Sequence, residues 1–213
     1  MEDYIFREAT IKDVDFIVTA IIEAEKSGSA ILSYSKIFNL SEAEVSNFLR
    51  KMLFEEIDGC EFSLSNYIVA EFGSNVVGTT GAWIERSDSP SAFIKRNLLS
   101  YFLPKESMVY ALSEAKIASE LVIDHLKDVL SLVVSYISPE HRGKNLFELL
   151  AKEHLKRNDG VTEIALQVMA NNTYAIKSYE KLGFKEIFRK KHPDKRIMDF
   201  LPYDEKLLMK KRI

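Results

Sequence analysis

The part of the sequence richest in candidate chemistry runs from Ile137 to Phe147, where a nearly all-apolar stretch ends and a helical pattern begins. Pro139 favours an extended turn there, and a glycine-containing loop leads directly into the helix. The first N–H groups of a helix lack partners inside it and lie at the positive end of its dipole, which suits a pyrophosphate. The forked guanidinium of Arg142 and the ammonium of Lys144 would add positive charge.

Taken alone, this segment does not fix a ligand. A strand, a turn and a helix with one glycine and two basic residues form a common combination, and most examples are solvated helix starts. The P-loop pattern G-x-x-x-x-G-K-[ST] and the Rossmann pattern G-x-G-x-x-G are both absent from the sequence. The segment is therefore a candidate phosphate site whose meaning depends on what accompanies it.

A second informative segment, Asn172–Phe184, follows an alternating strand pattern at Thr162–Met169. An Asn before the helix and a Gly after it are typical helix caps. By itself this segment predicts an amphipathic helix with Tyr179 packed against the core.

Taken in order, the two segments resemble the motifs of the GCN5-related N-acetyltransferase superfamily (GNAT). The family pattern N-x-x-A-x-x-x-Y-x-x-x-G-F is complete, and the pattern V-x-P-x-x-R-G-K-G-[IL] is matched with Ile at its first position and Asn145 at its last glycine. Weaker similarity covers Val76-Val77-Gly78 and the opening Arg7-Glu8-Ala9-Thr10. The matching residues are Asn172, Ala175, Tyr179, Gly183 and Phe184, and Ile137, Pro139, Arg142, Gly143, Lys144 and Leu146.

Two positions depart from the family pattern. Family members usually have Gly where this chain has Asn145, and often Gly or Ala where it has Phe147. Asn tolerates left-handed backbone angles better than most residues, so the first change is compatible with the turn. The ring of Phe147 either packs against the neighbouring strand or reshapes the channel for the pantetheine arm.

The resemblance implies an N-acetyltransferase that uses acetyl-CoA and no metal. An amine of the acceptor, a small molecule or a peptide, attacks the thioester directly while both substrates are bound. Backbone N–H groups around Ile137 stabilise the oxyanion, and Tyr179 protonates the departing thiolate. The residues implied in acetyl-CoA binding are Ile137, Arg142, Gly143, Lys144, Asn145, Leu146, Phe147, Asn172 and Tyr179.

The sequence does not assign the general base. Glu85 and Glu114 are candidates, although a solvated surface carboxylate is the simpler interpretation of each. Cys60 has no motif around it, so we expect a buried or half-buried thiol without a catalytic role. The alternative function is an acyl-CoA-binding sensor or scaffold without turnover, and the intact Tyr179 favours the enzyme.

These segments need a scaffold of alternating strands and helices. Ser41 and Glu44 predict a capping box before a helix, Ser27–Leu40 reads as a loop, and Gly78 and Gly81 predict a bulge or a close backbone approach. Without a linker or repeat, residues 1–213 should form one α/β domain, and the GNAT resemblance implies a mixed, mostly antiparallel central sheet flanked by helices. The predicted strands are Tyr4–Ala9, Tyr67–Phe72, Val76–Ile84, Val129–Ile137, Thr162–Met169, Phe184–Lys191 and Lys206–Arg212.

The stretch Ser87–Lys127 predicts a helical insertion between the third and fourth strands, where family members commonly have a short connection. Ser89-Pro90 and Pro104 interrupt it. It is either a stabilising helical excursion or a lid that walls the acceptor site. A helical stripe is predicted over Leu112, Ala115, Ala118, Val122 and Leu126.

Composition excludes several classes of protein. The net charge of −3 comes from 29 basic and 32 acidic residues mixed along the chain, which gives no footprint for nucleic acid or an anionic membrane. The four histidines lack metal-ligand spacing, and no stretch approaches the roughly 20 apolar residues of a membrane span. The single cysteine and the acidic first residues predict a cytoplasmic protein. Its expected oligomeric state is a monomer or a homodimer.

Overall fold

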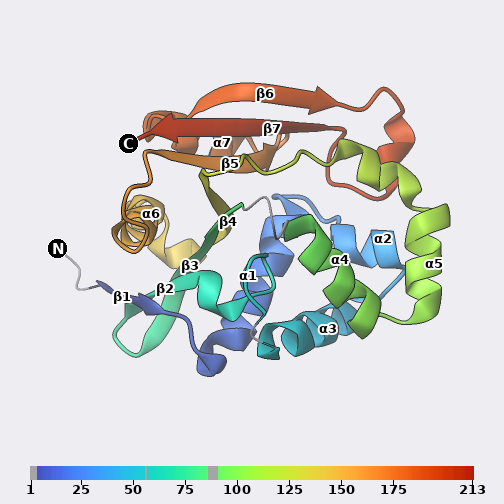
Figure 1. Ribbon diagram of the computed structural model, residues 1–213, viewed down its shortest axis with the longest axis horizontal. Coiled ribbons are helices and arrows are strands. Elements are labelled where there is room, and N and C mark those ends of the chain that lie inside the picture. The colour runs from blue at the N-terminus through green and yellow to red at the C-terminus, as the bar shows by residue number, and fades with distance from the viewer. Residues whose placement is uncertain (1–3, 56, 86–90) are drawn as a thin grey trace.

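The chain folds into a mixed α/β domain around one twisted sheet (Figure 1). The computed structural model describes residues 4–55, 57–85 and 91–213. Within them the sheet has seven strands in the order β1-β2-β3-β4-β5-β7-β6, and only the β4–β5 pair is parallel, as the predicted fold requires. The strands are β1 (Tyr4–Glu8), β2 (Tyr67–Phe72), β3 (Asn75–Ile84), β4 (Leu130–Ile137), β5 (Glu163–Met169), β6 (Lys185–Lys191) and β7 (Glu205–Arg212).

Helices cover both faces of the sheet (Figure 1). Helix α1 packs on β4 from one side, together with α2 and α3, and their apolar residues form the largest core cluster. Helix α6 packs on β2, β3 and β4 from the other side, where it shares a cluster with α7. The helices are α1 (Val14–Lys26), α2 (Ser33–Phe38), α3 (Glu42–Phe54), α4 (Ser91–Phe102), α5 (Lys105–Ser113), α6 (Leu146–Lys156) and α7 (Thr173–Lys181).

Local sequence signals place several of these elements correctly. The Ser41–Glu44 capping box forms, with the Ser41 N–H donating to the Glu44 carboxylate at 2.8 Å and the Glu44 N–H donating to the Ser41 hydroxyl at 3.3 Å. Gly81 is a close approach, because a Cβ there would lie 3.0 Å from the Tyr67 ring and 3.1 Å from Val133. The predicted closing pair is the antiparallel hairpin of β6 and β7.

Two sequence predictions are wrong. The segment Ser27–Leu40, expected to be a loop, contains α2, whose Tyr34 and Phe38 side chains are buried against α3. A six-residue helix is too short to show a helical repeat, and it is stabilised by this burial rather than by its own propensity.

The predicted helical stripe from Leu112 to Leu126 is the second error. Helix α5 ends at Ser113, a 3-10 turn covers Lys116–Leu121, and the chain then runs extended. Leu112 is 67% exposed and Val122 is 55% exposed, so the stripe is not one buried face. Packing of Leu121 against Ile197 and its neighbours decides this region rather than helical spacing.

The insertion between β3 and β4 is part of the core. Its helix α4 contributes Leu98 and Leu99 to the cluster under α1, and Leu103 follows them there. The predicted start of the insertion and its Ser89-Pro90 interruption lie outside the described residues, in 86–90. The insertion is mainly helical from Ser91 to Leu121, as predicted, and its last residues run extended.

Candidate active site

The sheet opens in its middle, where β4 and β5 separate (Figure 1). The two strands pair only over Leu130–Leu132 and Ile164–Leu166, although β4 continues to Ile137 and β5 to Met169. A bulge in β4 accompanies the separation, because Val134 and Ser135 together lie opposite one residue of β3. Val134 has φ of 46°, which is a strained conformation for a β-branched side chain.

The alternation of β4 directs a backbone donor into this opening. The Ser138 N–H donates to the Val77 carbonyl of β3 at 2.9 Å. Because successive N–H groups of a strand point to opposite edges, the Ile137 N–H points away from β3, toward the side that β5 has left. The Ile137 N–H is therefore a candidate for the oxyanion donor that the sequence analysis expected around this residue.

The segment after β4 forms the turn and helix start that the sequence predicted. Gly143 has φ of 78° and Asn145 has φ of 59°, so Asn145, at the position where the family pattern has Gly, takes the left-handed conformation that favours Gly. No side chain of a described residue caps α6. Its first N–H groups have no partner within the helix, and Arg142 and Lys144 before them are exposed. Arg142 also donates from Nε to the Ile137 carbonyl at 3.0 Å, which ties the turn to the end of β4.

Phe147 and Tyr179 bring the two motifs together. Their ring centroids are 5.1 Å apart, and both rings pack on Phe184. Of the two interpretations of Phe147, packing is therefore what the structure shows, although its partners are Tyr179 on α7 and Phe184 before β6. Burial raises the pKa of the Tyr179 hydroxyl to about 12, so this phenol stays protonated at neutral pH.

The remaining predicted cofactor residues have identifiable structural contacts. The Asn172 side chain accepts from the Ala175 N–H at 3.2 Å and so caps α7, as its position in the sequence suggests. Leu146 is buried under the sheet, and Ile137 packs beside it. Gly143 has open space around its Cα, which leaves room for a ligand to approach the backbone.

The candidate bases named from the sequence are poorly suited to that role. Glu85 accepts the Trp83 indole N–H at 3.2 Å and the Ser91 N–H at 2.9 Å, so its carboxylate is engaged. Glu114 is exposed at the end of α5. Cys60 is buried, as expected, and burial raises the pKa of its thiol to about 11, so it is not a ready nucleophile.

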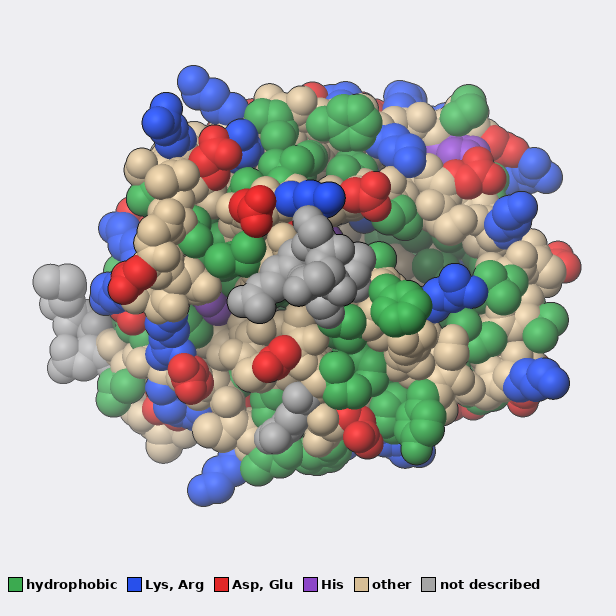
Figure 2. All heavy atoms as spheres, in the orientation of Figure 1, with side chains coloured by type: hydrophobic (Ala, Val, Ile, Leu, Met, Phe, Trp, Pro, Cys, Tyr) green, Lys and Arg blue, Asp and Glu red, His purple; other side chains and the backbone are tan. Residues whose placement is uncertain are grey.

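A partly buried polar cluster on the α1 face was not foreseen from the sequence. Lys95 of α4 forms an ion pair with Glu61, and its ammonium lies 3.2 Å from the Tyr34 hydroxyl. Burial alone would raise the pKa of the Glu61 carboxyl, but the neighbouring Lys95 ammonium lowers it overall. Figure 2 shows the molecular surface hollowed to the right of centre, between the β5–β7 layer and the helices α2 and α4. No local pattern signals this cluster, because its members are far apart in the sequence.

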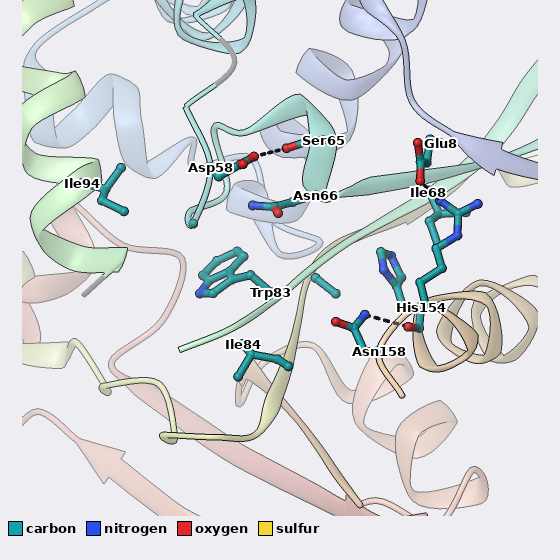
Figure 3. A pocket seen from close by; sticks show the side chains of 13 residues that line it. Glu8, Asp58, Ser65, Asn66, Ile68, Trp83, Ile84, Ile94, His154 and Asn158 are labelled. Carbon is teal, nitrogen blue, oxygen red and sulfur yellow. Dashed lines mark hydrogen bonds and ion pairs between the residues drawn. The ribbon is translucent and has the colours of Figure 1, made fainter. Parts of the chain in front are cut away.

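A separate pocket of about 470 Å³ lies at the C-terminal end of α6 (Figure 3). Its polar side chains are paired among themselves: Arg157 with Glu8 at 2.8 Å, and Asn158 with the His154 carbonyl at 2.8 Å. It adjoins the last residues of β3, whereas Arg142 and Asn145 lie at the opposite end of α6. This pocket is distinct from the opening between β4 and β5.

Comparison with known families identifies the chain. The profile of the Acetyltransferase (GNAT) family matches residues 34–184, well over half of the chain, and the match contains both motifs. The chain belongs to the GNAT acetyltransferase family. A comparison with curated proteins by sequence finds no significant match.

Solved structures share the GNAT fold over nearly the whole chain. An N-acetyltransferase from Staphylococcus aureus Mu50 has a TM-score of 0.65 at 17% identity, covering 97% of this chain and 100% of that one. A ribosomal-protein-alanine N-acetyltransferase from Brucella melitensis has a TM-score of 0.53 at 16% identity, with coverage of 98% and 99%. The acetyltransferase yncA from Salmonella typhimurium, solved with its cofactor acetyl-CoA, has a TM-score of 0.53 at 13% identity, with coverage of 99% and 94%.

The described part of the chain contains neither a membrane-spanning helix nor a metal-binding cluster. None of its helices combines the length and apolar character needed to cross a bilayer. Within residues 4–55, 57–85 and 91–213, no group of three or more His, Cys, Asp or Glu side chains is arranged to hold a metal ion.

Proposed function

We propose that this GNAT protein is an N-acetyltransferase that moves the acetyl group of acetyl-CoA directly to an amine, in a complex with both substrates. The observation that carries the proposal is the opening between β4 and β5, with a backbone donor of β4 at its edge and, after the same strand, the start of α6, which no described side chain caps. The yncA structure, which contains acetyl-CoA, supports the choice of donor. Arg142, Gly143, Lys144 and Asn145 would bind the pyrophosphate, and the opening would take the pantetheine arm.

The chain supplies three functions to this reaction. The N–H group of Ile137 would stabilise the oxyanion that forms on the thioester carbonyl. Tyr179 would donate a hydrogen bond or a proton to the sulfur that departs. Binding both substrates in one opening removes much of the entropic barrier, roughly 7–11 kcal/mol for well-aligned reactants.

We expect CoA and acetyl-CoA to raise the melting temperature. A ligand present at 100 times its dissociation constant stabilises the folded state by about 2.7 kcal/mol. Replacing Arg142 with Ala should weaken CoA binding by about 10-fold, because a charged contact to phosphate is lost. Differential scanning fluorimetry over a CoA concentration series measures both effects.

The matched controls are a ligand and a variant. Pantetheine lacks the pyrophosphate, so its affinity should be the same for the wild type and Arg142→Ala. Arg157 lies at the other end of α6, and Arg157→Ala should bind CoA as the wild type does. Absence of any shift with millimolar CoA would contradict the proposed function. Binding of acetyl-CoA without turnover on any amine would support a sensor instead.

We also propose that the insertion walls the acceptor site as a lid. Its extended end is clipped to the sheet at two points: Gln167 of β5 donates to the Ile123 carbonyl at 2.9 Å, and Lys190 of β6 donates to the Val122 carbonyl at 3.0 Å. Both carbonyls lie on the side of the sheet opposite α6, where Ile123 packs with Leu208.

Loosening either clip should raise the acceptor KM without changing the CoA-induced thermal shift. Gln167→Leu and Lys190→Met each remove one hydrogen bond worth about 1 kcal/mol, so we expect about a fivefold increase in KM. Steady-state kinetics with the acceptor varied at saturating acetyl-CoA measure it. The two hydrogen bonds come from different strands. A similar increase in KM in both variants would therefore be due to loosening of the insertion and not to a local change in β5 or β6. An unchanged KM in both would show that the insertion is only structural.

A further inference from the structure

The extended end of the insertion, residues 122–128, holds His125 in a fixed position. Besides the two clips from β5 and β6, the Asp128 N–H donates to the Glu85 carbonyl at 3.3 Å, which ties this segment to the end of β3. Glu85 also bridges Lys127 in parallel fashion. A side chain between these three attachments is positioned by the sheet rather than by a free loop.

The ring of His125 packs on Trp83, with centroids 5.0 Å apart at an angle of 62°. Trp83 lies opposite Ser131 in the β3–β4 register, one residue before Leu132, where β4 stops pairing with β5. Trp83 shares a strand face with Gly81, which contacts Tyr67 in the core cluster under α1. His125 therefore lies on the face of the sheet opposite α6, beside the paired part of β4 and β5 that precedes their separation after Leu132.

The imidazole of His125 is held in its basic form. It is half-buried, and burial lowers its pKa below the usual value, so it is neutral at pH 7. The charged groups that face it are Glu61 and Glu85, which raise the pKa, and Lys95 and Lys206, which lower it. Within the described part of the chain, the ring nitrogens of His125 have no hydrogen-bond partner.

The neighbouring carboxylates are already engaged. Glu61 is paired with Lys95, and Glu85 accepts two N–H groups. Among these three groups, His125 is the one whose proton-accepting atoms have no hydrogen-bond or ion-pair partner among the described residues. Glu85 and Glu114 were the candidates for the base from the sequence alone.

Ser131 gives an independent indication of chemistry at this place. Its hydroxyl is buried and has no hydrogen-bond partner among the described residues. Buried hydroxyls normally have a partner, and where the protein supplies none, bound water or a ligand does so. Since Ser131 lies opposite Trp83, this hydroxyl is on the same face of the sheet as the ring that His125 packs on.

We propose that His125 is the general base that removes a proton from the ammonium group of the acceptor, directly or through one water held by the Ser131 hydroxyl. The proposal rests on the proposed acetyl transfer. An alkylammonium has a pKa near ~10.4 and cannot attack while protonated, so a base is required at neutral pH.

The step balances as follows. The acceptor ammonium gives one proton to His125, and the free amine forms the C–N bond to the carbonyl carbon. The C–S bond breaks as the carbonyl re-forms, and the thiolate accepts a hydrogen bond from Tyr179. The second proton of the attacking nitrogen reaches the thiolate through solvent, and protonated His125 releases its own proton. One proton is released per acetyl group transferred.

The test uses His125→Phe, which keeps an aromatic ring on Trp83 and removes the base. With acetyl-CoA and a panel of primary alkylamines and dipeptides, kcat should fall by about 10²–10⁴-fold at pH 7. The wild-type kcat should show an acidic limb with its midpoint below the usual His pKa of about 6.5, whereas the variant should lose this limb and its rate should keep rising with pH toward the amine pKa. Hydroxylamine, already unprotonated at pH 7, should restore much of the loss.

Controls separate this role from folding and from the proposed function. The CoA-induced thermal shift should be unchanged in His125→Phe, Glu114→Gln should be fully active, and His125→Asn provides a smaller second variant without a base. Wild-type turnover that persists in both His125 variants with an unchanged acidic limb would overturn the role of His125 alone. A wild type that binds acetyl-CoA and acetylates no amine would overturn the proposed function and this role together.

Discussion

Replacement of Tyr179 by Phe is expected to lower kcat by about 10²-fold while CoA binding stays nearly unchanged. The substitution keeps the ring that packs on Phe147 and Phe184, so only the hydroxyl is lost. The loss should appear in kcat and not in CoA binding, because the hydroxyl stabilises the sulfur only when negative charge develops on it during the reaction. Steady-state kinetics together with a CoA thermal-shift series measure the two quantities.

The expected decrease in kcat follows from the difference between the pKa of Tyr179 and that of the departing thiol. Burial raises the pKa of Tyr179 to about 12, and a thiol ionises near ~8.5, so complete proton transfer from the phenol to the thiolate is uphill. Tyr179 should therefore act mainly as a hydrogen-bond donor, and a hydrogen bond to a charged group contributes about 1.5–3 kcal/mol. For the same reason, no basic limb from Tyr179 is expected in kcat below about pH 10. A variant with wild-type kcat would leave water as the proton source.

The second large effect concerns stability in acid, through His154 of α6. Its side chain is 4% exposed, and its Nε2–H donates to the Thr80 carbonyl at 2.7 Å. Burial lowers the pKa of His154 to about 4. The unfolded chain, with a His pKa near ~6.5, binds a proton in the interval where the folded protein does not. The contribution of His154 is thus complete above about pH 6.5 and is lost as the pH falls toward 4.

Between pH 7.5 and pH 4.5 this linkage should lower the free energy of unfolding by about 2.5 kcal/mol. His154→Gln can donate to the same carbonyl and does not titrate. Its free energy of unfolding should therefore fall by about 2.5 kcal/mol less than that of the wild type between pH 7.5 and pH 4.5. Urea denaturation of both proteins at the two pH values measures the difference, which cancels the acid sensitivity of every other group. Equal losses in the two proteins would show that His154 does not titrate as described.

Much of the scaffold could be predicted because its signals are local. The Ser41–Glu44 box, the Asn172 cap and the alternating strand patterns each report on neighbouring residues, and they place most of the strands and the helices α3, α6 and α7 within a residue or two. The helix boundaries in the insertion could not be predicted in the same way, because the packing of Leu121 against Ile197, and not a local repeat, sets where its helices end. Helix α2 was missed for the same reason.

In the candidate site, too, the features that depend on adjacent residues could be predicted, and those that depend on tertiary packing could not. The turn at Gly143 and Asn145 and the helix that carries Tyr179 could be predicted, since backbone conformation and capping depend on adjacent residues. The separation of β4 from β5 after Leu132 could not, because a strand pattern shows which face is apolar and not where pairing stops. The left-handed turn at Val134 contradicts the local preference of a β-branched residue, and the surrounding sheet must impose it. His125 meets Trp83 across more than forty residues of chain, a contact that depends on the path of the insertion over the sheet.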